Sequence, residues 1–267
     1  MSALNANLAT VHARAKFLRK LRPTVLASFA LGMISQRRIV DVEGLRLLID
    51  PTTHLGDEIL STGTYEPETV RLFRENVCTG DVVLDIGANE GFFAALAGSL
   101  VGSEGTVIGV EPQSRLHEVL EINLALNTAG RSKIIKRVVG ESDTINHQIW
   151  LFPISNTGAS SLVARYRFGA KSEQVQEITP TAIQTEAGVE RFDFVKIDVE
   201  GFEPEVIRAL APLMRAGKVG TLLLDYHAAI LTSRGIDPAV THELISECRM
   251  TAVEGDVGSG YVLYRRS

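Results

Sequence analysis

The 267-residue sequence has few cysteines, few aromatic residues and no long apolar run. Its two cysteines, Cys78 and Cys248, cannot form a disulfide framework and lack metal-site spacing, so we expect buried thiols in a reducing compartment. The apolar run at residues 24–35 is shorter than the about 20 residues that a transmembrane helix needs. Internal repeats and low-complexity segments are also missing. The remaining composition, 45% hydrophobic and 22% charged, is typical of a soluble globular protein.

Positive charge is concentrated at the amino terminus. Residues 1–40 contain seven Lys or Arg and no acidic residue, although the whole chain has a net charge of −5. The acidic remainder argues against a nucleic-acid partner, which would call for a basic face. The basic terminus could be a signal peptide, a helix on an anionic membrane surface or a helix packed on the domain. We favour packing, keep peripheral membrane contact as an alternative, and expect a cytoplasmic protein.

The order of apolar runs and turn residues predicts an α/β fold with an amino-terminal appendage. We expect a basic helical appendage at 1–40, a β-hairpin cap at 41–66 and the main domain at 67–267. Strands are predicted at 38–49 (a hairpin), 82–84, 106–110, 134–139, 149–152, 192–199, 221–226 and 251–264 (a hairpin), with helices after most of them. Their alternation predicts a mostly parallel sheet with helices on both faces. The polar segment 153–185 is long enough to be a lid with hairpins of its own.

Residues 82–92, Val-Val-Leu-Asp-Ile-Gly-Ala-Asn-Glu-Gly-Phe, are the most informative stretch. An apolar strand opens into a glycine-rich loop and then into an apolar helix. Gly87 and Gly91 allow a tight turn and a close approach to a ligand, and Asp85 stands where the strand reaches the crevice. Open α/β sheets bind nucleotides at such loops.

Glu111, at the end of the next strand, narrows the choice of nucleotide. An acidic residue about 20 positions after the loop is placed to accept hydrogen bonds from a ribose diol. Both dinucleotides and S-adenosylmethionine carry that ribose. The loop lacks Gly-x-Gly-x-x-Gly spacing, and Asp85 would repel a pyrophosphate but suit an ammonium or sulfonium. S-adenosylmethionine is therefore favoured over a nicotinamide cofactor, and an ordinary turn with a surface glutamate is the plain alternative.

Charged residues recur at the ends of two later strands. Alternation along strand 192–199 would place Lys196, Asp198 and Glu200 on one face, and Asp225 and His227 end the following strand. Neighbouring strands would bring these side chains into one crevice. A carboxylate or His227 could then take a proton from a substrate hydroxyl. Alternatively, Asp198, Asp225 and His227 could hold a divalent metal that lowers the hydroxyl pKa. The plain alternative is a Lys196–carboxylate ion pair with His227 capping a strand.

These motifs together resemble the FkbM family of S-adenosylmethionine-dependent methyltransferases over about residues 40–230. The resemblance rests on Gly-Thr-Tyr-Glu at 63–66, Asp-Ile-Gly-Ala-Asn-Glu-Gly at 85–91, Glu111-Pro112, Ala-Ser-Ser-Leu at 159–162 and Lys-Ile-Asp-Val-Glu-Gly at 196–201. It implies a Rossmann-like class I methyltransferase fold. Family members are typically O-methyltransferases of sugars, polysaccharide or glycolipid precursors, or polyketide-type products.

The resemblance also implies a set of donor-binding residues. Asp85, Gly87, Asn89 and Gly91 would line the methionine end of the donor, Glu111 would hold the ribose and Glu141 would lie near the adenine. The full implied set is Glu66, Asp85, Gly87, Ala88, Asn89, Gly91, Phe92, Glu111, Pro112, Glu141 and Ser160. Two positions depart from the family pattern. The turn at 139–142 reads Val-Gly-Glu-Ser where Ala-Leu-Gly-Asp is more usual, and Asp225 stands where Glu is frequent.

We therefore expect an S-adenosylmethionine-dependent O-methyltransferase acting on a hydroxyl of a sugar, a glycolipid or polysaccharide precursor, or a small natural product. The catalytic candidates are Lys196, Asp198, Glu200, Asp225 and His227. The Asn/Asp-Pro-Pro-Tyr/Phe motif of amine-directed nucleic-acid methyltransferases is missing, which favours an oxygen acceptor. The alternatives are a nicotinamide-dependent oxidoreductase and a donor-binding scaffold without turnover. The sequence does not predict an oligomeric state.

Overall fold

A seven-stranded sheet forms the centre of the computed structural model, which describes residues 10–16, 36–151, 157, 160, 162, 171–255 and 260–267. The strand order is β11-β12-β10-β9-β3-β4-β5. The parallel strands are β3 (Val82–Ile86), β4 (Thr106–Val110), β5 (Arg131–Ile135), β9 (Phe192–Ile197) and β10 (Val219–Asp225). The antiparallel edge is β12 (Tyr261–Arg266) and β11 (Met250–Gly255). The predicted Rossmann-like α/β fold is confirmed.

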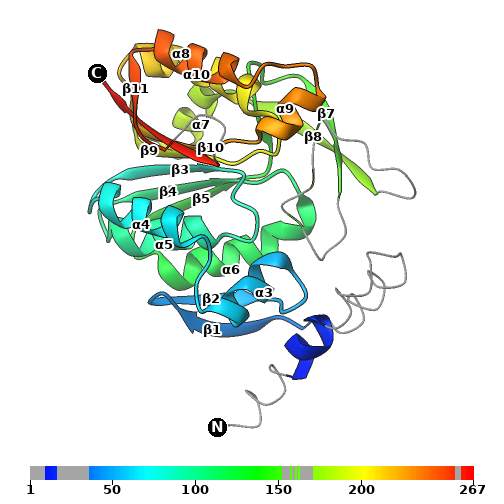
Figure 1. The fold of residues 1–267 in the computed structure, drawn as a ribbon. Helices are drawn as coiled ribbons and strands as arrows, with labels where there is room; N and C mark the ends of the chain where they lie inside the picture. Colours follow the sequence, from blue (N-terminus) through cyan, green and yellow to red (C-terminus); the bar gives the residue numbers. More distant parts are fainter. Residues whose placement is uncertain are drawn as a thin grey trace.

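Helices cover both faces of this sheet (Figure 1). One face carries α7 (Pro180–Ala187), α8 (Glu203–Arg215), α9 (Ala228–Ser233) and α10 (Ala239–Glu247). The other carries α4 (Pro67–Asn76), α5 (Phe92–Val101) and α6 (His117–Asn127), which follows the short helix η1 (Ser114–Leu116). Because strand side chains alternate between faces, Val83 and Leu84 of β3 belong to two different hydrophobic cores.

The amino-terminal hairpin packs under the second of these helical layers. It consists of β1 (Arg38–Val42) and β2 (Leu45–Ile49) and is followed by α3 (His54–Thr62), as the hairpin prediction at 38–49 requires. Leu45, Leu47 and Ile49 are buried in the core that α5 and α6 share. The Asn123 carboxamide of α6 accepts from the Leu48 amide and donates to the Glu90 carbonyl, each at 2.7 Å. The hairpin is thus connected to the glycine loop.

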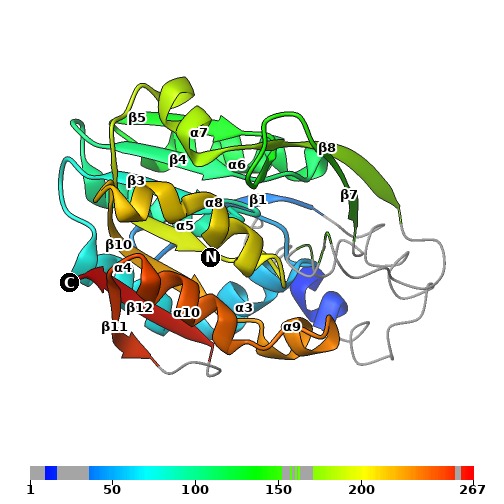
Figure 2. The same ribbon diagram turned by 90° about the horizontal axis from the view of Figure 1, so that it is seen from above.

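The predicted strand at 134–139 is wrong. β5 ends at Ile135, and β6 (Val138–Val139) pairs instead with β8 (Ser172–Ile178) in a separate three-stranded sheet that β7 (Asn146–Trp150) completes. Lys136 and Arg137 separate the two strands and form ion pairs with Glu121 and Glu186 on neighbouring helices. β7 and β8 extend away from the central sheet (Figure 2). Within the predicted lid segment 153–185 the structure describes residues 157, 160, 162 and 171–185, which include β8 and the start of the helix at 180–187, and β8 pairs with β7, which precedes the segment. The rest of the segment lies outside the described residues, so the predicted lid stays a prediction.

Three further expectations concern the termini and the cysteines. Cys248 is buried as predicted, but the prediction for Cys78 is wrong, because Cys78 is exposed just after α4. Helical residues 10–16 lie beside α3, where His12 Nε2 is 2.8 Å from Asp57 Oδ1. Most of the basic terminus and the apolar run 24–35 fall outside the described residues. Among the helices that the structure describes, none is long and apolar enough to cross a membrane.

Candidate functional site

A pocket of about 250 Å³ lies at the carboxyl edge of the parallel sheet. Its wall combines the loops that follow β3, β4, β9 and β10 with residues of α3 and of the small β6–β8–β7 sheet. Ten residues predicted for the site line it: Glu66, Gly87, Asn89, Glu111, Pro112, Ser160, Asp198, Glu200, Asp225 and His227. This is the position at which ligands bind in open α/β sheets.

Gly87 allows two of these loops to touch. Its φ is +88°, and a Cβ atom placed there would lie 1.8 Å from the Asp198 carbonyl oxygen. The Asp198 amide in turn donates to the Ile86 carbonyl at 3.0 Å. Only glycine fits this contact, because any side chain would separate the β3 and β9 loops.

Backbone strain gathers around the same pocket. Glu66, Asn89 and Glu200 all line the pocket and have φ values of 41°, 50° and 49°. Non-glycine residues seldom adopt this left-handed conformation, and such residues cluster at functional sites. The folded structure therefore keeps these three residues in a strained backbone conformation, which sets the direction of their polar side chains at the pocket.

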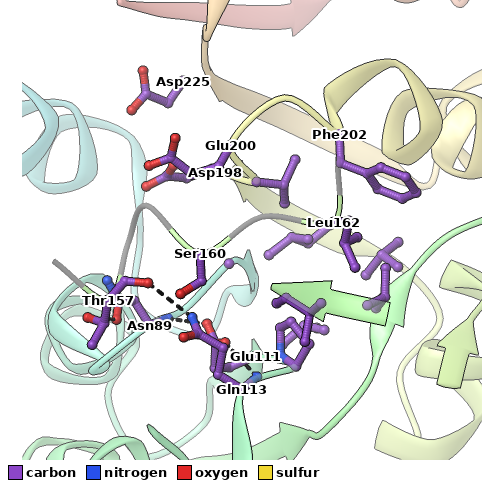
Figure 3. Close-up of a pocket in the computed structure, with 18 of the residues that line it drawn as sticks. Asn89, Glu111, Gln113, Thr157, Ser160, Leu162, Asp198, Glu200, Phe202 and Asp225 are labelled. Carbon is purple, nitrogen blue, oxygen red and sulfur yellow. Dashed lines mark hydrogen bonds between the residues drawn. The ribbon is translucent and has the colours of Figure 1, made fainter. Parts of the chain in front are cut away.

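Glu111 forms a buried acceptor on the floor of the pocket (Figure 3). Its Oε2 accepts from the Asn89 amide at 2.9 Å and its Oε1 from the Gln113 amide at 2.8 Å. Burial raises the pKa of Glu111 to about 7, although these two amides oppose the shift. A carboxylate offers about four lone-pair positions, so Glu111 can still accept hydroxyl hydrogen bonds from a ligand.

Thr157 and Gln113 extend this floor. The Gln113 side-chain amide donates to the Thr157 carbonyl at 3.2 Å, and the Thr157 hydroxyl donates to Asn89 Oδ1 at 2.9 Å. Sequence reasoning missed both residues as members of the site. The position of Gln113 directly after Glu111-Pro112, at the end of β4, is the signal that could have found it.

The predicted acidic cluster is brought together at the other end of the pocket, where Figure 3 shows Asp198 beside Glu200, with Asp225 above them. His227 Nε2 lies 3.6 Å from Glu200 Oε2 and 3.8 Å from Asp198 Oδ1. Asp198, Asp225 and His227 each offer one ligand atom, and these atoms lie within 4.8 Å of one another. The adjacency of β9 and β10 produces this convergence.

The four groups differ in their titration. Burial raises the pKa of Glu200 to about 7, although His227 opposes the shift. Burial and the Asp198 charge also raise the pKa of Asp225. Burial would raise the pKa of Asp198 too, but Lys196 and His227 outweigh it and lower that pKa. For His227, burial would lower the pKa, but a hydrogen bond to Glu203 and the nearby carboxylates raise it to about 9.

The expectation that Lys196, Asp198 and Glu200 share one strand face is wrong. β9 ends at Ile197, so the two carboxylates lie on the loop, and Lys196 is buried beneath the pocket rather than on its wall. Lys196 Nζ lies 3.0 Å from Asp198 Oδ2, the ion pair of the plain alternative. Asp85 is buried beside it. Burial raises the pKa of Asp85 to about 6, and the charge of Lys196 opposes the shift.

Four more predicted donor residues do not line the pocket. Ala88, Gly91 and Phe92 are buried behind the wall where α5 begins, and the Phe92 ring packs edge-on against Tyr65 at 5.2 Å between centroids. Glu141 is exposed in the turn after β6 and lies 3.6 Å from Arg208. The first three residues shape the loop, whereas Glu141 is exposed and pairs with a residue of α8.

An apolar wall completes the pocket opposite the acidic cluster. Phe202 and Leu162 lie on this side (Figure 3). Its members are Val138, Val139, Ile149, Leu162, Phe202 and Val206. Sequence reasoning missed this wall because valines and isoleucines in strands are equally typical of a hydrophobic core and of a pocket lining. The pocket thus offers a polar floor, an acidic end and an apolar side, a combination that suits an amphipathic ligand.

The chain is similar to several known proteins. A family model described as the methyltransferase FkbM domain matches residues 85–233. Similar solved structures include a methyltransferase FkbM from Methylobacillus flagellatus, with 16% identity and a TM-score of 0.45 over 82% of this chain and 56% of that chain. Fibrillarin from Aeropyrum pernix with bound S-adenosyl-L-methionine has 14% identity and a TM-score of 0.45 over 85% and 82% of the two chains.

A TehB-like S-adenosylmethionine-dependent methyltransferase from Corynebacterium glutamicum has 12% identity and a TM-score of 0.44, over 79% of this chain and 93% of that chain. At such identities these likenesses concern the fold alone. No curated protein sequence matches the chain.

Proposed function

This chain belongs to the FkbM methyltransferase domain family, and from that premise we propose that it transfers a methyl group from S-adenosylmethionine to a hydroxyl oxygen. The proposed acceptor is a small molecule or a carbohydrate. The observation that carries the proposal is a single pocket that joins the glycine loop and Glu111 to the cluster of Asp198, Glu200, Asp225 and His227.

The residues of the pocket fit the donor. Glu111 is a buried carboxylate that can accept further hydrogen bonds besides those from the two backbone amides, which suits a ribose diol. The apolar wall that includes Val138 and Phe202 suits an adenine ring, and the acidic residues of the pocket suit a cationic methionine end. When bound, S-adenosylmethionine supplies a methyl group that its sulfonium charge already activates.

The protein's remaining tasks are to hold the acceptor oxygen in line and to remove its proton. Glu200 is our candidate proton acceptor, because burial raises its pKa to about 7 and a general base works best near the operating pH. His227, whose pKa is raised to about 9, carries a proton on Nε2 near neutral pH, and this N–H, 3.6 Å from Glu200 Oε2, would stabilise the Glu200 carboxylate. Asp198 and Asp225 would accept hydrogen bonds from other hydroxyls of the acceptor.

A divalent metal is a second candidate role for Asp198, Asp225 and His227, whose ligand atoms lie within 4.8 Å of one another. Two carboxylates and one imidazole suit several divalent ions, and a bound ion would lower the pKa of the acceptor hydroxyl. The pKa of about 9 at His227 means that protons compete with any ion at this ring. Activity that disappears with EDTA and returns with one added ion would favour this role.

We propose a neutral acceptor rather than a nucleic acid. Glu66, Asp198, Glu200 and Asp225 all line the pocket, and their charges would repel the phosphates on which nucleic-acid affinity depends. Hydroxyl groups, in contrast, donate well to carboxylates.

The test combines binding with transfer. Calorimetric titration should show S-adenosylmethionine binding that Glu111→Ala weakens at least tenfold, while the exposed control Glu141→Ala leaves affinity unchanged. Transfer of labelled methyl groups into glycolipid, polysaccharide or small-molecule extracts should follow, with a 14-dalton increase in product mass. Glu200→Gln should abolish most transfer without altering donor affinity. No donor binding would refute the proposal, and binding without transfer to any extract would favour the scaffold alternative.

A further inference from the structure

Glu203 is a buried carboxylate beside the acidic cluster that no motif predicted. It is the first residue of α8 and its side chain is fully inaccessible. Oε1 accepts from the Gly201 amide at 3.0 Å and from His227 Nδ1 at 2.6 Å. Oε2 is also buried, and no group in the described part of the chain hydrogen-bonds to it.

A helix cap alone does not account for this arrangement. The positive end of the α8 dipole favours a carboxylate, and the bond to Gly201 satisfies one backbone amide. An aspartate, serine or threonine could do the same, and a buried oxygen without a partner costs free energy. The shorter of the two bonds of Oε1 goes to His227, so contact with the ring distinguishes Glu203 from an ordinary cap.

This hydrogen bond determines how the His227 ring faces the pocket. With Glu203 as a carboxylate, which can only accept, Nδ1 carries the proton of the 2.6 Å bond. Nε2 is then directed toward Glu200 and Asp198, at 3.6 and 3.8 Å. A carboxylate that holds one ring nitrogen fixes the direction of the other, whether that nitrogen donates to a neighbouring carboxylate or binds a metal.

The segment around Glu203 is also joined to α9, the helix that follows His227. The His227 carbonyl accepts from the Ile230 and Leu231 amides at the start of α9. At the other end of α9, the Arg234 guanidinium donates to the Gly201 carbonyl and, at 2.7 Å, to Glu205. Arg234 therefore ties helix α9 to loop 198–203 and to α8 close to the Glu203–His227 bond, which limits the movement of these segments relative to each other.

We propose that Glu203 is the positioning residue of the site and that it holds the His227 ring with Nε2 toward the reacting groups. This rests on the proposed function for its catalytic consequence, but the orientation itself can be measured without donor or acceptor. Glu203 does not line the pocket and so acts only through His227.

The test uses Glu203→Gln in the full-length protein, with Glu177→Gln as a matched control. Glu177 is a second buried glutamate that hydrogen-bonds a histidine, His147, outside the pocket. In protein labelled with ¹⁵N-histidine, NMR of the wild type should show a strongly hydrogen-bonded Nδ1–H for His227, assigned with His227→Gln. Glu203→Gln should remove or shift that signal, and kcat should fall about 10- to 100-fold with donor affinity unchanged. The Glu177→Gln control should change neither kcat nor the His227 signal.

Each outcome decides one claim. An unprotonated or freely exchanging Nδ1 in the wild type overturns the positioning role even if Glu203→Gln fails to fold. An equal loss of kcat in both variants also overturns it. If the NMR signal behaves as expected but the wild type methylates no extract, the orientation stands and the proposed methyl transfer fails.

Discussion

The ion pair between Arg37 and Glu90 should be one of the costliest contacts to break in this protein. Glu90 lies inside the glycine loop, and its side chain is completely buried. Arg37, just before β1, donates to Glu90 Oε2 at 2.6 Å and keeps 27% of its own side chain exposed. Burial raises the pKa of Glu90, and Arg37 is the main influence that lowers it. Arg37→Ala would leave a buried carboxylate without its cation.

Two limits give the expected magnitude. Removing one partner of a buried ion pair typically costs about 3–5 kcal/mol. The cost cannot exceed that of protonating Glu90 instead, which at pH 7 and an unfolded pKa of about 4.3 is about 3.7 kcal/mol. At pH 5 the same ceiling falls to about 1 kcal/mol. We therefore expect Arg37→Ala to lower the free energy of unfolding by about 2–3.5 kcal/mol at pH 7 and by less than about 1 kcal/mol at pH 5.

The direction of this pH dependence follows from linkage. The folded-state pKa of Glu90 is raised, so ionisation of this carboxyl costs stability as pH rises above its unfolded pKa. Arg37→Ala removes the influence that offsets this cost, so the penalty grows with pH. Glu90→Gln in the Arg37→Ala background removes the charge and should recover most of the loss at pH 7.

Urea unfolding of each variant at the two pH values measures the effect. Arg38→Ala is the matched control, because Arg38 hydrogen-bonds the Arg37 carbonyl and the exposed Gln36 and should cost about 0.5 kcal/mol or less. The reasoning is refuted if Arg37→Ala is no more destabilising than Arg38→Ala at pH 7. A loss that stays the same at pH 5 would also refute it.

Three other substitutions test the site. Gly87→Ala should lower the free energy of unfolding by at least about 2 kcal/mol and abolish donor binding in calorimetry, because its Cβ would lie 1.8 Å from the Asp198 carbonyl oxygen. Gly188→Ala is the control: a Cβ there has open space, so the loss should be only about 1 kcal/mol. The rate of methyl transfer should rise with pH through about 7, because Glu200 must lose its proton to act as a base, and Glu200→Gln should remove that limb of the profile. His227→Asn should lower kcat about 100-fold with donor affinity unchanged; an unaltered rate would contradict the cluster assignment.

The sequence predicted the central sheet well because each of its strands has a recognisable local sequence pattern. Buried parallel strands such as β3 and β4 are short apolar runs bounded by glycine or acidic turns, and helices between them exclude most other topologies. The same order placed Asp198 and Asp225 at one edge, since the carboxyl ends of neighbouring parallel strands meet there.

The errors came from features that alternation cannot encode. Val138 and Val139 continue the apolar run of β5, and only tertiary pairing with β8 shows that they belong to another sheet. The Lys196 prediction assumed that β9 continues to residue 199. The chain instead leaves the strand after Ile197, because the next loop must approach Gly87. An apolar pocket wall is equally hidden, since its residues have the composition of a core.

The site is supported from two independent directions, which explains where sequence reasoning succeeded and where it failed. The glycine loop is held from behind by the hairpin, through Arg37–Glu90 and through Asn123. The acidic end is held by Glu203 and by the Arg234 contacts around α9. Sequence motifs contain the residues that contact a ligand. These supporting residues contact the motif residues instead, so several residue types could serve there, and only the structure shows the contact. Because the two supports share no residue, we expect substitutions in one support to leave the contacts of the other intact.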